Sequence, residues 1–411
     1  MQKLLITRPL PETVLTAARA RFDVTLRDST APLTAAELRA SLRDFDAVLP
    51  TLGDRFQADV FADTPTPRAK ILANFGVGFN HIDTVAARAA GIAVTNTGKE
   101  LPFDKLAIAT GADPKPLTCE GGDLDGVLYM RGIDDANALK ERWGSIRNIV
   151  VIGGGFIGLE VAAVAQKYGK TVTVLHSRDR LMSRAVGPEV SEFFLEAHRK
   201  RGTTVHLNTR VNKLHGDSGK VTGVELPDGS VIPADAVMVG IGVSPRSELA
   251  EQLGLTTENG AIVVDAFART SDPRVVASGD VALLPHPLTG ERMVMLESVQ
   301  NAVDQSKVAA KSLLGASEEY HAVPWFWSDQ ADLKLQMAGL SAGYDQSVLR
   351  GNPAEDKFSV LYYKNGRIIA VDAVNDVSDY MAVRRALTAG QTIPADLAAD
   401  SSVALKTIFA D

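Results

Sequence analysis

Cysteine is nearly absent from this sequence of 411 residues, which contains only Cys119. A single cysteine cannot form an internal disulfide, and such scarcity is typical of proteins kept in the reducing cytoplasm. It also excludes any redox mechanism that needs a pair of cysteines in a C-x-x-C or C-x₄-C motif.

An excess of positive charge and long apolar runs are also missing. The chain has 43 Lys and Arg against 50 Asp and Glu, which gives a net charge of −7. This balance argues against nucleic acid or an anionic membrane as the main partner. No apolar stretch reaches membrane-spanning length, and the apolar run at the N-terminus is too short for a signal peptide. We expect a cytoplasmic protein with no metal site, and the sequence does not indicate an oligomeric state.

The overall composition is that of an ordinary globular protein. Hydrophobic residues make up 45% of the chain and charged residues 23%, which is close to the average for folded domains. A chain of 411 residues is too long for one hydrophobic core, so its length predicts two to four domains.

The most informative motif lies within residues 148–180. Residues 149–152 form a short β-branched run, which predicts a buried parallel strand. Gly153, Gly155 and Gly158 then complete a G-x-G-x-x-G pattern. In a dinucleotide site the first glycine permits a tight turn, the second lets the backbone approach a pyrophosphate, and the third lets helix and strand pack closely.

The context of these glycines strengthens the prediction. A helix is expected from Phe156 to about Gly169, and its N-terminal N–H groups would face the pyrophosphate. A second strand follows at residues 171–175. A glycine-rich turn that only packs is the alternative, but the strand–turn–helix–strand order favours a site for NAD(P)H.

The residue after the second strand bears on the choice between NADH and NADPH. A carboxylate there would bind the ribose 2′-OH of NADH, but this sequence has His176, Ser177 and Arg178. Cationic and hydrogen-bonding groups suit a 2′-phosphate better, so the pattern favours NADPH. The alternative is that these residues belong to a solvated loop.

The first hundred residues alternate short strands and helices, which predicts a small parallel sheet of flavodoxin-like β/α type. Residues 75–83, FGVGFNHID, and residues 91–97, GIAVTNT, resemble the start of the D-2-hydroxyacid dehydrogenases. The resemblance places the loop of Gly76 and Gly78 near a substrate carboxylate, but it stops at residue 97. The catalytic Arg, Glu and His motifs of that family do not follow, and we interpret His81 as a packing residue. Hydroxyacid dehydrogenase activity is therefore the least favoured alternative.

From Gly98 onward the sequence resembles another family. Residues 99–112, which include Thr110 and Gly111, look like the hairpin and A-T-G strand of flavoproteins with two dinucleotide sites. The resemblance is to the FAD-dependent ferredoxin and rubredoxin reductases of the putidaredoxin reductase type, and it covers residues 98–411. It implies hydride transfer from NAD(P)H to FAD, followed by single-electron transfer to a small iron–sulfur protein. Electrons would leave directly from the flavin, which agrees with the absence of a cysteine pair.

The same resemblance implies the roles of several residues. Glu160 would lie near the nicotinamide, in the catalytic centre, and Asp280 would accept a hydrogen bond from a ribityl hydroxyl of FAD. A helix opening near Val299 would direct its N-terminus at the flavin. The alternative for this segment is an ordinary capped helix. The alternative for Trp327, which the resemblance places at the flavin, is an ordinary core aromatic. The implied cofactor-binding residues are Gly153, Gly155, Gly158, His176, Arg178, Thr110, Gly111, Gly242, Gly279, Asp280, Val299 and Trp327.

One expected motif is missing. The reductases begin with their own G-x-G-x-x-G for the ADP half of FAD, whereas residues 76–81 have His81 in the place of the last glycine. We therefore expect weakened FAD binding. A lysine that this family supplies from the lost segment as the partner of Glu160 is missing too. A protein that binds NAD(P)H without catalysing a reaction is therefore the second hypothesis, after the reductase.

The two resemblances together predict the domain organisation. The fold class is α/β, a Rossmann-type architecture with two dinucleotide domains and a C-terminal α+β domain. The join, near Gly98, would form a hairpin from residues 93–96 and 101–103. The expected domains are a dehydrogenase-like segment at 1–97, a partial FAD domain at 98–118 and 246–317, an NAD(P)H domain at 119–245, and a C-terminal domain at 318–411.

Overall fold

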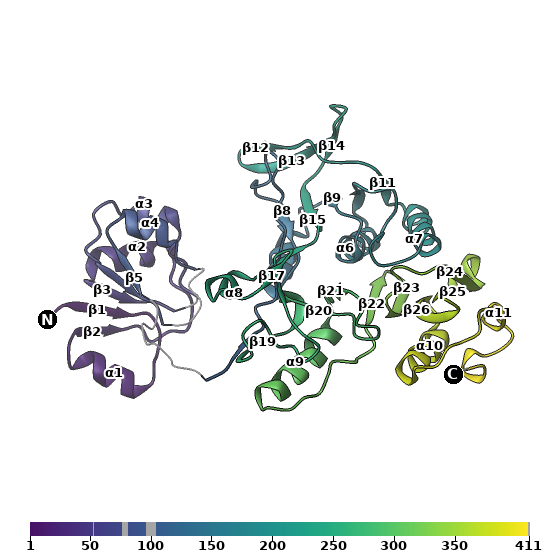
Figure 1. Ribbon diagram of the computed structural model, residues 1–411. Helices are drawn as coiled ribbons and strands as arrows, with labels where there is room; N and C mark the ends of the chain where they lie inside the picture. Colours follow the sequence, from purple (N-terminus) through teal and green to yellow (C-terminus); the bar gives the residue numbers. More distant parts are fainter. Residues whose placement is uncertain (52, 76–80, 96–103, 410–411) are drawn as a thin grey trace. The chain divides into compact units, whose positions relative to one another are not determined.

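The computed structural model describes residues 1–51, 53–75, 81–95 and 104–409. The chain divides into two compact units, Met1–Phe103 and Asp104–Asp411, and Figure 1 labels their helices and strands. Residues 93–95 of the hairpin predicted across the join form a strand, and the rest of that hairpin and the predicted loop of Gly76 and Gly78 lie outside the described residues.

The smaller unit is a doubly wound β/α sheet. Its five parallel strands follow the order β2-β1-β3-β4-β5, which is the flavodoxin-like order and confirms that prediction. Alternate residues of β1 supply two cores, with Leu5 in one and Leu4 and Ile6 in the other. The elements are β1 (Lys3–Ile6), α1 (Glu12–Arg19), β2 (Asp23–Leu26), α2 (Ala35–Asp44), β3 (Ala47–Leu49), α3 (Ala58–Ala62), β4 (Ile71–Ala73), α4 (Thr84–Ala89) and β5 (Ala93–Thr95).

The larger unit contains a second parallel sheet, which carries the G-x-G-x-x-G turn. Its strands follow the order β11-β10-β9-β15-β8. Residues 149–152 of β9 are all buried, as their apolar run predicts. The elements of this region are β8 (Val127–Tyr129), α5 (Ile133–Arg142), β9 (Asn148–Ile152), α6 (Phe156–Lys167), β10 (Thr171–Leu175), α7 (Pro188–Lys200), β11 (Thr204–His206) and β15 (Ala236–Val239).

The two faces of this sheet are covered differently. Ile149 and Val151 pack in one core with Leu159 of α6 and Phe194 of α7. Val150 and Ile152 pack in another, against a three-stranded antiparallel sheet. The strands of that sheet are β12 (Lys213–Asp217), β13 (Lys220–Glu225) and β14 (Val231–Pro233).

A third part of the larger unit consists of small sheets, whose strands come from before and after the nucleotide-binding region in the sequence. Strand β6 is parallel to β19, and β7 is antiparallel to β16. Among the described residues, β6 pairs with β19 at one edge, and no strand pairs with its other edge. The elements are β6 (Leu106–Ile108), β7 (Ala112–Pro114), β16 (Val243–Pro245), α8 (Glu248–Gln252), β17 (Thr257–Glu258), β18 (Ala261–Val263), β19 (Val275–Ala277), β20 (Ala282–Pro285), β21 (Met293–Val294) and α9 (Val299–Leu313).

The C-terminal region is an antiparallel sheet with helices, as predicted. The turn between β25 and β26 holds Asn365 and Gly366, both at positive φ, which matches the hairpin expected from an Asn-Gly pair. One face of the sheet shares a core with α6 and α7, and α10 packs on the other. In sheet order the strands are β22 (Trp325–Gln330), β23 (Leu333–Gly339), β26 (Arg367–Val374), β25 (Lys357–Lys364) and β24 (Gln346–Asn352), with α10 (Val377–Ala389) and α11 (Ala395–Ala398) following.

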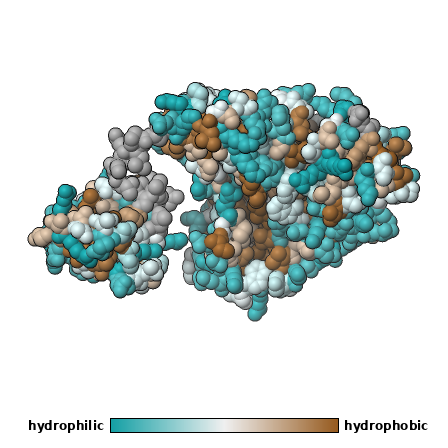
Figure 2. Space-filling model, turned by 90° about the horizontal axis from the view of Figure 1, so that it is seen from below, coloured by the Kyte–Doolittle hydropathy of each residue, from teal (hydrophilic) through white to brown (hydrophobic). Residues whose placement is uncertain are grey.

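The surface of the larger unit is mostly hydrophilic on the face drawn in Figure 2, with hydrophobic residues in small patches and a narrow band. The exposed large apolar side chains of this unit include Val299 and Trp327. Among the described residues, no helix has the length and the apolar character that crossing a membrane requires.

Candidate functional site

Gly153 and Gly158 are required by the fold of the turn itself. Gly153 has φ of +119°, and a Cβ there would collide with the carbonyl oxygen of Gly240. A Cβ on Gly158 would collide with the carbonyl oxygen of Gly153. The first contact holds β9 close to the end of β15, and the second holds α6 close to β9, so both glycines serve close backbone packing.

Gly155 is different, because nothing in the protein crowds it. It is the N-cap of α6, and a Cβ built on it would have no neighbouring atom within 4 Å. The open space therefore lies at the N-terminus of a helix of twelve residues, whose free N–H groups and dipole favour an anion. This arrangement fits the pyrophosphate of a dinucleotide, for which bare backbone at Gly155 gives access.

His176 bonds to the glycine turn. Its Nδ1 accepts a hydrogen bond from Gly154 N–H at 3.1 Å. Its Nε2 lies 3.0 Å from the carbonyl oxygen of Arg180, and it must carry the proton because a carbonyl only accepts. Burial lowers the pKa of the imidazole, so the ring is neutral near pH 7. Ser177 and Arg178, which follow it, are exposed.

Glu160 lies on α6, one turn beyond Gly155, and is partly buried. Burial raises the pKa of its carboxyl, and a hydrogen bond from Ser328 opposes that rise. The Ser328 hydroxyl donates to Oε1 of Glu160 at 2.6 Å. Among the described residues no lysine bonds to this carboxylate, and a hydroxyl from the C-terminal sheet bonds to it instead.

Asp280 and Gly279 lie in the short 3₁₀ turn Gly279–Val281 that follows β19. The N–H of Gly279 donates to Oε1 of Gln305 on α9 at 2.9 Å. A carboxylate oxygen of Asp280 lies 3.1 Å from Nη2 of Arg131. The contact of Arg131 was not predicted, although this residue is the first cation after the end of β8.

Thr110 and Gly111 lie where β6 leads into β7. The hydroxyl of Thr110 donates to the carbonyl oxygen of Arg246 at 2.7 Å, and Arg246 N–H donates to the carbonyl oxygen of Gly111 at 2.9 Å. Gly242, at φ of +106°, immediately precedes β16, which pairs with β7. These residues therefore belong to the paired segments that join the nucleotide sheet to the β6–β19 sheet.

Val299 and Trp327 are both exposed, at 65% and 43% of their surface. Val299 is the first residue of α9, and the hydroxyl of the N-cap Ser298 accepts a hydrogen bond from Asn301 N–H at 3.1 Å. The Trp327 ring lies 5.7 Å from that of Trp325, at an interplanar angle of 31°. Exposed aromatic surface of this kind is available to a planar ligand, whereas an ordinary core aromatic would be buried.

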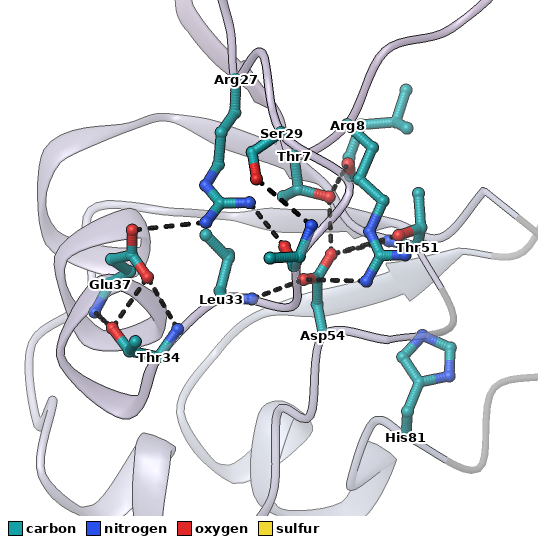
Figure 3. A network of polar contacts seen from close by, with 12 residues as sticks. Thr7, Arg8, Arg27, Ser29, Leu33, Thr34, Glu37, Thr51, Asp54 and His81 are labelled. Atoms are coloured by element: carbon teal, nitrogen blue, oxygen red, sulfur yellow. Dashed lines mark hydrogen bonds and ion pairs between the residues drawn. The ribbon is translucent and has the colours of Figure 1, made fainter.

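The smaller unit has its own buried polar cluster, drawn in Figure 3, around Asp54. This carboxylate is fully buried and accepts hydrogen bonds from the hydroxyl of Thr7 at 2.6 Å and from Leu33 N–H at 3.1 Å. His81 is buried, its Nε2 lies 3.0 Å from Oδ1 of Asn74, and burial lowers its pKa. These bonds agree with the interpretation of His81 as a packing residue.

Two family models match the chain. Residues 11–306 match "Pyridine nucleotide-disulphide oxidoreductase", and residues 325–409 match "Reductase C-terminal". The first match spans β9, the glycine turn and Asp280, and the second spans the C-terminal sheet from β22 onward.

Curated relatives are similar over most of the chain. A ferredoxin–NAD(P)(+) reductase of a Sphingomonas species is 45% identical over 71% of this chain and 70% of the relative. Rhodocoxin reductase of Rhodococcus erythropolis is 44% identical over 75% of this chain and 72% of the relative. Putidaredoxin reductase of Pseudomonas putida is 39% identical over 77% of this chain and 76% of the relative.

Solved structures with the same architecture include two reductases. The ferredoxin reductase for the CYP199A2 system of Rhodopseudomonas palustris is 32% identical, with a TM-score of 0.73, over 99% of both chains. The reductase in a covalent putidaredoxin reductase–putidaredoxin complex is 31% identical, with a TM-score of 0.72, over 99% of this chain and 98% of the other.

Proposed function

This chain belongs to the pyridine nucleotide-disulphide oxidoreductase family, and from that premise we propose that it passes electrons from NAD(P)H through FAD to a small iron–sulfur protein. The open space at Gly155, on the N-terminus of α6, is the observation that carries the proposal. Relatives named for ferredoxin, putidaredoxin and rubredoxin support the choice of partner. FAD, when bound, accepts two electrons from NAD(P)H and releases them one at a time.

The chain's own residues bind and orient these groups in the proposed reaction. Gly155 admits the pyrophosphate of NAD(P)H. Glu160 lies on α6, the helix that Gly155 caps, and faces the nicotinamide. Asp280 binds the ribityl chain of FAD, and Val299 and Trp327 border the flavin. The exposure of Val299 and Trp327 supports their assignment to the flavin. The ion pair of Asp280 with Arg131 supports a polar site at Asp280.

We propose that the N-terminal unit derives from a D-2-hydroxyacid dehydrogenase-like segment at residues 1–97. The other domain boundaries are proposed as predicted from the sequence. Two observations support this proposal. The unit ends at Phe103, close to the expected join, and its strand order is flavodoxin-like. The unit has no G-x-G-x-x-G for the ADP half of FAD, so its residues do not fit that half of the cofactor. The single cysteine supports the cytoplasm as the location.

Flavin content separates the proposed reductase from a protein that only binds NAD(P)H. We expect the purified chain to contain well below one equivalent of FAD and to bind added FAD weakly, because the amides that would cradle its ADP half are missing. Absorbance in the flavin band measures the first, and an FAD titration the second. Dye reduction by NADPH should then depend on added FAD. Tightly bound stoichiometric flavin would contradict the weakened site, and saturation with FAD without dye reduction would contradict the reductase.

NADPH is the proposed electron donor because Ser177 and Arg178 are exposed after β10, whereas both ring nitrogens of His176 bond to the protein and offer nothing to a 2′-phosphate. The substitution His176→Glu tests this choice. A carboxylate at this position would bind the ribose 2′-OH and repel a 2′-phosphate. We expect the ratio of NADPH to NADH affinity to fall by about 10- to 100-fold, which corresponds to about 1.4–2.8 kcal/mol. Calorimetric titration with 2′-phospho-ADP-ribose and with ADP-ribose measures the ratio. His176→Gln is the matched control, and an unchanged ratio in His176→Glu would show that this residue does not set the preference.

A further inference from the structure

A continuous row of buried polar side chains connects the candidate nicotinamide site to helix α7. It begins at Glu160 on α6, passes through Ser328 and Gln330 on β22, and ends at His198 on α7. Ser328, Gln330 and His198 are each at most 3% exposed. The row crosses twice between the nucleotide-binding region and the C-terminal sheet, so three separate segments of the chain form it.

The direction of every hydrogen bond in this row is fixed by the chemistry of its ends. An ionised carboxylate only accepts, so the Ser328 hydroxyl donates to Glu160 at 2.6 Å. The oxygen of Ser328 then accepts from Nε2 of Gln330 at 3.1 Å. The amide oxygen of Gln330, 2.8 Å from His198 Nε2, must accept from it. All donors therefore point towards Glu160, and each bond polarises the next.

The two ends of the row, His198 and Glu160, differ in charge because of their surroundings. His198 has a pKa lowered by burial, so it is a neutral donor near pH 7. Burial raises the pKa of Glu160, and the charge of Asp329 on β22 raises it further. The Ser328 hydroxyl and the Asp329 backbone oppose that rise. The ionised form of Glu160 thus depends on donors supplied by β22.

We infer that Ser328, Gln330 and His198 are positioning residues that hold the Glu160 carboxylate ionised and in one orientation towards the nicotinamide. The inference rests on the proposed placement of Glu160 beside that ring. An ionised carboxylate there attracts the positive charge of the oxidised nicotinamide and so favours NADP⁺ over NADPH. The packing of β22 against α6 therefore sets the relative affinity of the site for NADP⁺ and NADPH.

The test compares the pH dependence of NADP⁺ binding in Ser328→Ala and in the unchanged protein, with excess FAD present. Loss of a hydroxyl donor to a carboxylate should move the pH at which NADP⁺ binding strengthens upwards by about one pH unit. Ser328→Thr, which keeps the hydroxyl, should restore the original profile. Glu160→Gln and Glu160→Gln/Ser328→Ala should both lose this transition, because the titrating group is gone.

A ligand without nicotinamide separates the possible failures. Ser328→Ala should bind 2′-phospho-ADP-ribose as the unchanged protein does at every pH. If the unchanged protein does not bind this ligand, the proposed dinucleotide site is wrong. If Ser328→Ala weakens both ligands equally at all pH values, or leaves the NADP⁺ profile in place, the row is only structural and the inference is overturned. Should Ser328→Ala not fold, Gln330→Met removes the next donor and is expected to shift the profile in the same direction.

Discussion

Gly155→Ala is expected to weaken the binding of NADPH by about 10- to 100-fold, or about 1.4–2.8 kcal/mol, while the protein stays folded. The Cβ would meet no protein atom within 4 Å, so the change leaves the turn unstrained. It would instead occupy the space in which the pyrophosphate must approach the backbone. Calorimetric titration with NADPH and thermal unfolding of the same sample measure the two effects separately.

Two other glycines serve as controls for this result. Gly158→Ala should lower the unfolding temperature, because its Cβ would collide with the carbonyl oxygen of Gly153. Gly144→Ala lies in open space away from the turn and should change neither stability nor affinity. A Gly155→Ala protein that binds NADPH as tightly as the unchanged chain would show that the pyrophosphate does not lie at this turn.

Asp372→Asn is expected to remove a steep loss of stability between about pH 4 and pH 7. Asp372 on β26 is buried, and burial raises the pKa of its carboxyl from 3.8 to about 7. Between these two values the folded protein holds a proton that the unfolded chain has released. The free energy of unfolding therefore falls as pH rises, by about 1.4 kcal/mol per pH unit, and becomes level above the folded pKa.

The contacts of Asp372 show why this carboxyl is held in place. The Tyr362 hydroxyl donates to Oδ2 of Asp372 at 2.6 Å. The N–H of Gly187, which is the N-cap of α7, donates to the Tyr362 hydroxyl at 2.9 Å. The C-terminal sheet is thereby bonded to the start of a helix in the nucleotide-binding region.

Urea unfolding at a series of pH values measures the difference between Asp372→Asn and the unchanged protein. The difference should grow in favour of the variant as pH rises from 4 to 7. Asp217→Asn, at an exposed position, is the matched control and should run parallel to the unchanged protein. Parallel curves for Asp372→Asn as well would mean that Asp372 titrates normally in the folded state.

The parts of this structure that could be predicted from sequence depend on local signals. Residues 149–152 form a buried strand because every side chain in the run is apolar, and α6 begins directly after the glycines. The Asn365-Gly366 hairpin and the capping box that opens α2 at Thr34 and Glu37 are likewise determined by neighbouring residues. Each of these features depends on residues that lie only a few positions apart, which is why features of this kind can be predicted from sequence.

The contacts that complete the site could not be predicted in the same way. Ser328 and Glu160 are 168 positions apart, and Arg131 and Asp280 are 149 apart. Their meeting depends on how β22 packs on α6 and on where β8 ends relative to β19. The inward bonds of His176 were also missed, because sequence gives the residue type but not which groups its ring nitrogens contact.

The core shared by α7 and the C-terminal sheet has a consequence for the synthesis of the protein. Phe194 of α7 is fully buried together with Phe358, Val360 and Tyr362 of β25, yet the ribosome produces these partners much later. At about 5–20 residues per second, the gap corresponds to roughly 10 to 30 seconds. Throughout that interval the part of α7 that β25 covers in the finished fold lacks this partner, so we expect a chaperone to act on that part of the growing chain.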